Sequence, residues 1–138
     1  MDAFTNDDCE LCHIALNEDQ EIVFENDNCY FLRLKQSNDK GQVLSGAGLI
    51  VPKAHKETVF DLSIEEWHDT YQLLRKVKAY IDDEFKPEGY NVGWNVGTVG
   101  GQHIHHAHLH VMPRYEQETM AGKGIRSQIK SYQNRLEQ

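Results

Sequence analysis

The chain has 138 residues, of which 39% are hydrophobic and 26% charged, with only 3 prolines and 10 glycines. This length suits one domain with its own core, and this composition excludes collagen-like, low-complexity and wholly disordered proteins. The 14 Lys and Arg against 22 Asp and Glu give a net charge of −8. Such a charge disfavours generic nucleic-acid binding, although a small phosphorylated ligand can still be held locally.

The N-terminal region argues against export. Residues 1–27 contain nine acidic side chains and no Lys or Arg, the opposite of a signal peptide. No apolar run approaches the roughly 20 residues that span a bilayer. Cys9, Cys12 and Cys29 are therefore interpreted as reduced thiols or metal ligands, and we expect a cytoplasmic protein without a membrane partner.

The first half of the chain predicts strands. Residues 21–25 and 29–34 are short β-favouring runs around a turn-rich tripeptide, which predicts a hairpin. The polar, glycine-containing stretch 35–48 predicts a surface connection. Residues 49–51 (LIV) then predict a buried strand.

The most regular pattern predicts a long helix that begins near Ile64 and ends before Pro87. Ser63 and Glu66 have the spacing of a capping box, which satisfies the first backbone N–H groups of a helix. Apolar residues recur at three- and four-residue steps, and we expect them to form one buried face. These residues are Ile64, Trp67, Tyr71, Leu74, Val77 and Ile81.

The second half predicts further strands around a glycine-rich turn. Residues 90–96 predict a strand, residues 97–101 a turn, and residues 106–112 a strand with histidines on one face and apolar residues on the other. Residues 125–136 predict a short amphipathic C-terminal helix. The fold class is therefore α+β, a mostly antiparallel sheet with one long helix packed on it and a short tail helix.

Five of the eight histidines fall between His103 and His110. Alternate histidines on a strand are about 6.6 Å apart, so neighbouring rings can interact. Three readings remain open on the residues alone: a metal site, a nucleophilic imidazole that attacks phosphorus, and a polar strand without chemistry. The glycine-rich turn before the row can direct backbone N–H groups at an anion, which favours phosphate as the ligand.

These residues resemble a known family. The run from Gly101 to Arg114 (GQHIHHAHLHVMPR) is similar to the signature of the histidine-triad (HIT) superfamily, in which Gly-Gln precedes three histidines separated by single apolar residues. Residues 51–55 (VPKAH) and 89–97 resemble two further elements of that family. The resemblance implies one HIT domain over residues 1–138, with its core at about 9–114 and a C-terminal tail at 115–138.

The resemblance also implies a function. HIT proteins of this kind are nucleotide hydrolases or transferases, commonly homodimers, that cleave dinucleoside polyphosphates or nucleoside phosphoramidates at the α-phosphorus. His108 would form a covalent nucleotidyl-histidine, His110 would contact the α-phosphate or leaving group, and His106 would orient the row. The implied substrate-binding residues are Asn95, Gly101, Gln102 and His103. A nucleotide-binding module with little turnover is the alternative.

Two positions depart from the family pattern. His103 stands where relatives often carry Ser or Thr, and an imidazole there can act as a donor or acid or change substrate preference. Residues 29–35 contain no acid to bind ribose hydroxyls, so ribose recognition is an open question.

Cys9 and Cys12 form a C-x-x-C motif, which suits a redox pair or half of a zinc site. No βαβ pattern surrounds the motif, which disfavours a redox pair. The resemblance implies that His55 and His106 complete a zinc site. A closed Cys₂His₂ set leaves no open position on the metal, so the zinc would be structural. The closed set also argues against hydrolysis by the zinc itself.

Overall fold

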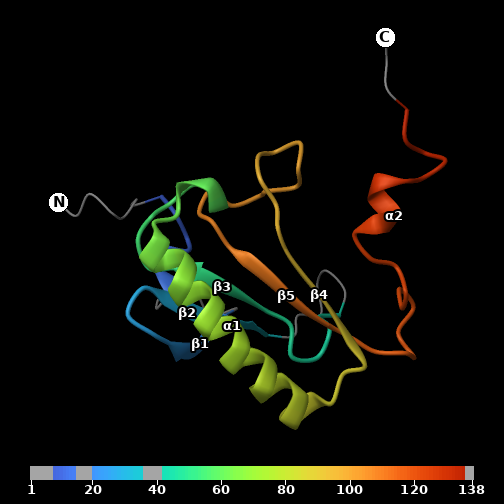
Figure 1. The fold of residues 1–138 in the computed structure, drawn as a ribbon, viewed down its shortest axis with the longest axis horizontal. Coiled ribbons are helices and arrows are strands. Elements are labelled where there is room, and N and C mark those ends of the chain that lie inside the picture. Colours follow the sequence, from blue (N-terminus) through green and yellow to red (C-terminus); the bar gives the residue numbers. More distant parts are fainter. Residues whose placement is uncertain (1–7, 15–19, 36–41, 136–138) are drawn as a thin grey trace.

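The computed structural model describes residues 8–14, 20–35 and 42–135. Five strands form one antiparallel sheet in the order β1-β2-β3-β5-β4. The strands are β1 (Gln20–Glu25), β2 (Cys29–Leu34), β3 (Gly48–Pro52), β4 (Gly89–Trp94) and β5 (Leu109–Arg114), and the helices are α1 (Ile64–Phe85) and α2 (Arg126–Ile129). Figure 1 shows α1 crossing the sheet and α2 standing apart from it. The predicted α+β fold class, with one long helix and a short tail helix, is confirmed.

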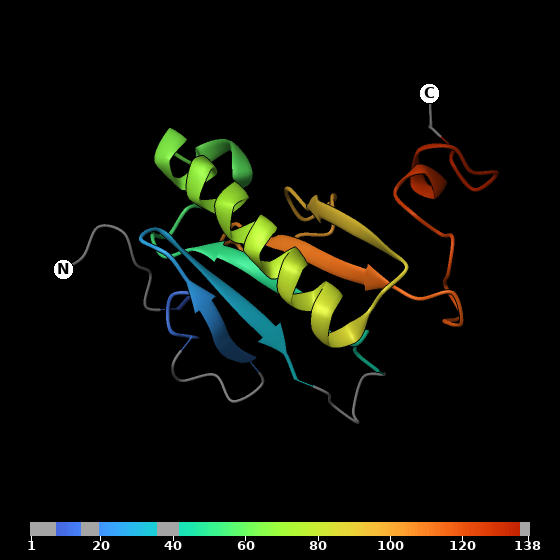
Figure 2. The same ribbon diagram turned by 60° about the horizontal axis from the view of Figure 1, so that its bottom comes forward.

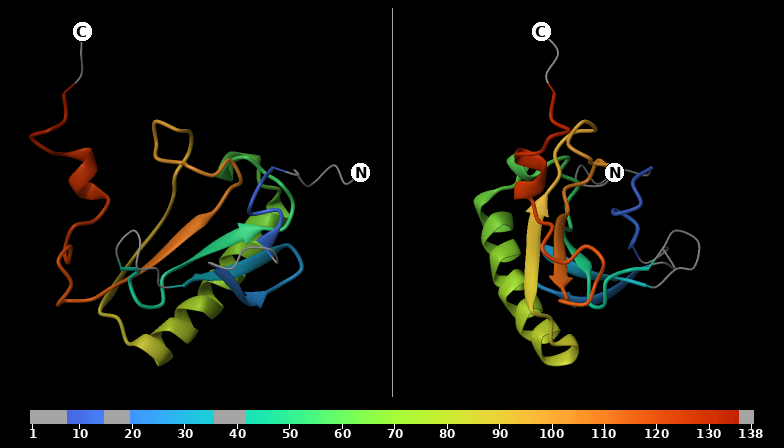
Figure 3. Two further views of the ribbon diagram at one scale, coloured as in Figure 1. Left: turned by 180° about the vertical axis from the view of Figure 1, so that it is seen from behind. Right: turned by 90° about the vertical axis from the view of Figure 1, so that its right-hand side faces the viewer.

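The sheet has two different faces. Helix α1 covers one face, where its buried side chains pack on the strands (Figure 2). The N-terminal segment of residues 8–14 lies on the opposite side, as the right-hand view of Figure 3 shows. Leu11 and Ile14 of this segment pack on Leu32 and Leu49 of the sheet. The molecule is thus layered, with the helix on one face and a thin cover on the other.

The bounds of α1 follow from local chemistry. The Ser63 hydroxyl accepts from the Glu66 N–H at 3.1 Å, and the Glu66 carboxylate accepts from the Ser63 N–H at 2.8 Å. The predicted capping box is therefore formed. At the other end Lys86 adopts a left-handed conformation with φ of 52°, and Pro87 follows. Proline cannot continue a helix without losing a hydrogen bond, so the helix stops there.

The predicted buried face of α1 is correct only in its C-terminal half. Val77 and Ile81 are fully buried, whereas Ile64, Trp67 and Tyr71 are exposed. Glu66, Thr70 and Leu73 take the buried positions instead. Glu66 is held by the capping box, and the Thr70 hydroxyl donates to the Glu66 carbonyl at 2.7 Å. Local hydrogen bonds therefore satisfy these polar groups inside, and the apolar side chains are left on the surface.

The strand that carries the histidines begins later than predicted. Strand β5 starts at Leu109, so His106 and His108 precede it and only His110 lies within it. The neighbouring strand explains the difference, because β3 ends at Pro52, which has no N–H for a ladder hydrogen bond. The Ala107 N–H donates instead to the Lys56 carbonyl at 2.6 Å.

The remaining expectations concern the hairpin, the connection and the tail. Strands β1 and β2 form the predicted hairpin, and strand β4 ends at Trp94 rather than at residue 96. Residues 36–41 of the predicted connection and residue 136 of the predicted tail helix lie outside the described residues. No helix in the described part of the chain is long and apolar enough to cross a membrane.

Candidate functional site

The three histidines of the triad lie together at the start of β5. His106 is fully buried, His108 is 7% exposed, and His110 is half-buried. His103 and His105 are exposed on the loop that leads to them. The structure therefore separates the five clustered histidines into an inner group of three and an outer group of two.

His108 is held in one tautomer by the backbone. Its Nδ1 lies 2.7 Å from the carbonyl oxygen of His106. A carbonyl oxygen can only accept, so Nδ1 carries the proton and donates it. The Nε2 atom of the neutral ring is then unprotonated and presents a lone pair. This is the form in which an imidazole acts as a nucleophile.

His110 is next to His108, with the ring centroids 4.9 Å apart and the rings 64° from coplanar. Its Nε2 is buried and makes no hydrogen bond within the described residues. Burial, followed by the positive charge that His108 would carry, lowers the pKa of His110. A buried polar atom of this kind needs a partner, and a substrate oxygen or nitrogen can supply one.

His106 has both ring nitrogens engaged. Its Nε2 lies 2.8 Å from the Pro52 carbonyl, so Nε2 carries the proton and Nδ1 presents a lone pair. Nδ1 lies 3.5 Å from the sulfur atoms of both Cys9 and Cys12. Burial lowers the pKa of His106 to about 4, which keeps the ring neutral. A neutral imidazole with a lone pair directed at two thiols is suited to bind a metal.

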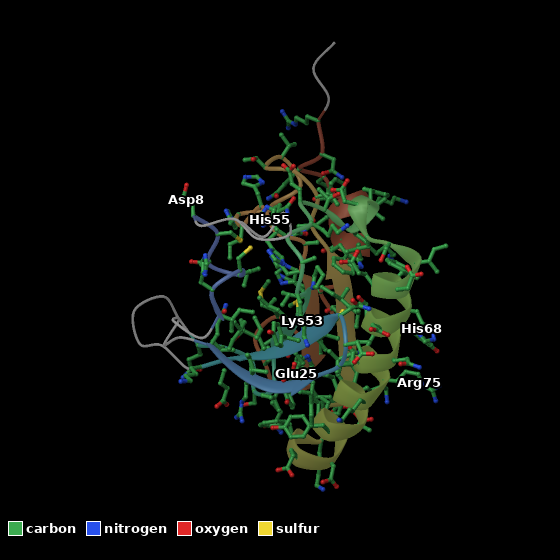
Figure 4. All side chains as sticks on the ribbon, turned by 90° about the vertical axis from the view of Figure 1, so that its left-hand side faces the viewer. Asp8, Glu25, Lys53, His55, His68 and Arg75 are labelled. Atoms are coloured by element: carbon green, nitrogen blue, oxygen red, sulfur yellow. The ribbon has the colours of Figure 1, made fainter. Side chains whose placement is uncertain are left out.

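Cys9, Cys12, His55 and His106 form a cluster that could hold a metal ion, because their four ligand atoms all lie within 4.8 Å of one another. The Cys12 sulfur is 3.2 Å from Nδ1 of His55. Ligand atoms around a tetrahedral zinc are about 3.3–3.8 Å apart, given bonds of about 2.0–2.3 Å. Figure 4 shows His55 on the side of the N-terminal segment, away from α1. The donor set and its spacing fit zinc.

The glycine-rich turn is braced by Gln102, which is 2% exposed. Its amide nitrogen donates to the carbonyls of Glu57 at 2.7 Å and Ile104 at 3.0 Å, and its amide oxygen accepts from the Gly97 N–H at 2.9 Å. Both N–H groups of the amide are thus used by the backbone. In this arrangement Gln102 shapes the turn and has no donor left for a ligand.

Asn95 and Gly101 lie side by side at the mouth of the same turn. The Asn95 amide nitrogen donates to the Gly101 carbonyl at 3.4 Å. Gly101 has φ of +95°, a conformation that L side chains rarely adopt, which explains glycine here. The structure therefore brings together two of the predicted substrate-binding residues.

The outer histidines border a separate hollow. His103 and His105 line a cavity of about 760 Å³ together with Cys9, His55 and Glu57, among others.

The carbonyls of Pro52 and Glu57 position His106 and Gln102, and sequence reasoning missed both of these backbone roles. No side-chain pattern reveals a backbone acceptor. The resemblance of residues 51–55 to a family element was the signal that pointed to this segment.

Comparisons with known proteins agree with the geometry. The family model described as HIT domain matches residues 15–117. The chain is 38% identical over 77 residues to Protein hit of Bacillus subtilis strain 168, covering 56% of this chain and 53% of that protein. It is 35% identical over 79 residues to adenosine 5'-monophosphoramidase hnt1 of Schizosaccharomyces pombe, covering 57% and 56%. The chain spans about half the length of these curated relatives.

A third relative is the asymmetrical bis(5'-nucleosyl)-tetraphosphatase of Schizosaccharomyces pombe, 27% identical over 94 residues, covering 68% of this chain and 52% of that protein. Among solved structures, a HIT family member from Bacillus subtilis matches with a TM-score of 0.68 and 29% identity, covering 80% of this chain and 76% of that one. A Zn-bound histidine triad family protein from Mycobacterium smegmatis has the same fold, with a TM-score of 0.67, 20% identity and coverage of 83% and 81%. Family model, relatives and fold agree, and the chain belongs to the HIT family.

Proposed function

We propose that this protein is a nucleotide hydrolase or transferase that cleaves a dinucleoside polyphosphate or a nucleoside phosphoramidate at the α-phosphorus through a covalent nucleotidyl-His108. One observation carries the proposal: the His106 carbonyl fixes the proton on Nδ1 of His108 and leaves Nε2 as a nucleophile. Two fission yeast relatives are named for activities on these two substrate classes.

The reaction has two displacements. In the first, Nε2 of His108 bonds to the α-phosphorus, and the bond from phosphorus to the leaving oxygen or nitrogen breaks with its electron pair. His110, whose buried Nε2 has no partner in the described residues, would donate a hydrogen bond to the phosphate or leaving group. In the second, water attacks phosphorus, loses a proton and releases a nucleoside 5'-monophosphate from His108.

The substrate would be held on both sides of His108. Asn95 and the turn at Gly101 would lie against the phosphate oxygens, and His103 would contact the leaving group. The resemblance to the family also implies a phosphate contact for Gln102, whereas its present hydrogen bonds support a bracing role for this side chain. The apolar cluster around Leu11 would offer a surface for the base.

His108→Asn tests the proposal. Asparagine can keep the hydrogen bond to the His106 carbonyl but is no nucleophile, so turnover should fall about 10⁴-fold or more, about 5.5 kcal/mol of barrier. Mass spectrometry after brief mixing with diadenosine polyphosphate or adenosine phosphoramidate should show a nucleotidyl adduct on the wild type and none on the variant.

The exposed His68 on α1 gives the matched control, and His68→Asn should behave as wild type. Nucleotide binding without turnover in the wild type would favour the alternative of a binding module. Turnover by His108→Asn at the wild-type rate would refute the covalent step.

We also propose that zinc is the metal of the Cys9, Cys12, His55 and His106 cluster, where it would be structural. The support is the donor set itself, with two sulfurs facing Nδ1 of His106. Zinc bound there would hold the His106 ring, and the His106 carbonyl in turn holds His108. Both thiols must be reduced to bind zinc, which favours a cytoplasmic location.

Elemental analysis of protein purified without chelator checks this site. We expect about one zinc per chain in the wild type and none in the Cys9→Ser/Cys12→Ser double variant, together with a lower melting temperature. Cys29→Ser is the control, because this buried thiol lies on the α1 side of the sheet. Metal-free wild type whose stability is unchanged by added zinc would contradict the proposal.

A homodimer is the oligomeric state that we propose. Strand β4 ends the sheet, and beside it Trp67, Tyr71 and Val92 are exposed around an apolar hollow of about 230 Å³. A second copy would cover this surface and pair with the strand edge. Val92→Asp should shift sedimentation from dimer to monomer, whereas Val99→Asp in the exposed turn should not. A wild type that is monomeric at micromolar concentration would contradict the proposal.

We further propose that residues 1–138 form a single HIT domain, with its core at about 9–114 and a tail at 115–138. The described strands form one sheet on which α1 packs, which supports this division.

A further inference from the structure

The C-terminal segment approaches the catalytic histidines across β4. Gly93 of β4 is paired directly with His110 of β5. Side chains of directly paired residues in an antiparallel sheet point to the same face, with their Cβ atoms about 4.5–5.5 Å apart. Because Gly93 has no side chain, β4 leaves the space beside His110 open on that face.

Ile125 borders this space. A Cβ placed on Gly93 would lie 3.7 Å from the Cδ1 atom of Ile125, an ordinary van der Waals distance. Gly124 lies close to Asn91, another residue of β4. A Cβ placed on Gly124 would lie 3.2 Å from the Asn91 amide nitrogen. Asn91 pairs with Met112, so it too belongs to the face that carries His110. The segment before α2 therefore lies along the face of β4 that carries the site.

Arg114, at the end of β5, holds this segment in place. Its guanidinium donates to Asn91 Oδ1 at 2.6 Å, to the Lys123 carbonyl at 2.9 Å and to the Met120 carbonyl, and it forms an ion pair with Glu118 at 2.6 Å. The Arg114 and Glu118 side chains are only 13% and 12% exposed. Planar, multidentate contacts of this kind fix geometry as well as charge.

A second set of contacts fixes the start of the segment. The Tyr115 N–H donates to the second Glu118 oxygen at 2.8 Å, and the Tyr115 hydroxyl donates to the Ser45 carbonyl at 2.6 Å. The Glu116 N–H donates to the Glu88 carboxylate at 3.0 Å. Together with Arg114, these contacts tie the segment to the end of the catalytic strand.

We infer that Ile125 is a positioning residue for His110, held by Arg114, and that it forms the outer wall of the catalytic site. Ile125 limits the access of water to the His110 ring from the side that Gly93 leaves open. The half-buried state of His110 agrees with such a cover. The inference rests on the proposed function for its effect on turnover, whereas the position of Ile125 can be tested without any substrate.

Ile125→Ala is the main test, because the side chain is 59% exposed and its truncation should leave the fold intact. Since Ile125 acts through His110, which works during bond cleavage, we expect kcat to fall roughly three- to tenfold with KM nearly unchanged. Ile125→Leu should restore most of the rate. NMR spectra of imidazole-labelled protein without substrate should show a shifted His110 signal in Ile125→Ala.

Ile129→Ala is the matched control, because Ile129 ends the short helix α2 that Ile125 precedes and is 75% exposed. It should change neither kcat nor the His110 signal. Arg114→Lys keeps the charge but loses the multidentate contacts, so we expect the same kcat loss together with faster proteolysis of the segment after residue 114.

The two readouts separate the inference from the proposed function. A wild type without turnover would refute the proposed function, and the NMR comparison would still decide the position of Ile125. An Ile125→Ala protein whose His110 signal matches that of Ile129→Ala would overturn the inference. An unchanged kcat in Ile125→Ala would overturn it as well.

Discussion

The two faces of the sheet differ in the chemistry that they carry. The face under α1 is a continuous apolar cluster formed by Phe31, Ile50, Leu73, Val77, Ile81, Leu109 and Val111, with Cys29. The opposite face has a thin cover, residues 8–14, and the two cysteines of this cover could hold a metal together with His55 and His106. Apolar burial gains stability without any cofactor, whereas a polar cluster needs its partners to be complete. Apolar packing therefore stabilises both faces, since Leu11 and Ile14 also pack on Leu32 and Leu49, whereas the polar cluster lies on the face away from α1.

Strand β5 links the faces. Leu109 and Val111 point into the cluster under α1, while His110 and Met112 point the other way. The two-residue period of a strand makes this possible, because neighbouring side chains lie on opposite faces. A core that fixes β5 from one side therefore positions His110 on the other.

Among the substitutions that test this comparison, Ile81→Ala should change the free energy of unfolding most. Ile81 is fully buried under the sheet, so the free energy of unfolding should fall by about 2–5 kcal/mol in urea denaturation. Metal content and turnover per folded molecule should be unchanged. Leu11→Ala, on the cover between Cys9 and Cys12, should instead lower the metal affinity. If Ile81→Ala lowered metal affinity as much as Leu11→Ala, the two faces would not be independent.

Acidification should lower the free energy of unfolding through His110, on the face that carries the site. Burial first, and then His108, lower the pKa of His110 in the folded state. Between that lowered pKa and the ordinary value near 6.5, the unfolded chain binds a proton that the folded chain does not. Stability is therefore full above about pH 6.5 and falls as the pH drops, by at most about 1.4 kcal/mol per pH unit for one proton.

Denaturation curves at several pH values between 7.5 and 5 measure this dependence. The slope should decrease in His110→Gln, which cannot be protonated, and should be retained in His103→Gln, which changes an exposed ring. Equal slopes in wild type and His110→Gln would show that His110 is not held neutral by burial.

The sequence predicted the elements whose signals are local. The capping box at Ser63 fixed the start of α1, and Pro87 fixed its end. The motif from Gly101 to Arg114 identified the family. The resemblance to that family, and not a local pattern, supplied His55 and His106 as partners of the C-x-x-C pair, and the structure brings these four residues together.

The features that the sequence did not predict depend on tertiary context. The start of β5 was placed too early because it depends on where a different strand, β3, ends. The sequence pattern predicted Trp67 inside, but Trp67 is exposed. Thr70 takes a buried position instead, because its hydroxyl is satisfied by a hydrogen bond within the helix. The contacts of Arg114 with the tail join residues whose roles are not encoded in any local pattern.

The exposed loop allows the smallest and most selective test. His103 stands on the outer rim and lines the large hollow with Glu57. An imidazole is longer than a serine hydroxyl, so it places its donor farther from the backbone. We expect the His103 ring to contact the leaving group and not the nucleophile.

His103→Ser should therefore change the ratio of phosphoramidate to polyphosphate turnover, by a few-fold, with little effect on stability because the side chain is exposed. Parallel kcat/KM measurements with one substrate of each class give the ratio. His105→Ser is the matched control, since His105 is equally exposed, lines the same hollow and is only two residues away. A ratio that is the same in wild type and His103→Ser, with both rates measurable, would exclude His103 from leaving-group recognition. A ratio that changes equally in both variants would assign the effect to the charge of the rim and not to a contact made by His103.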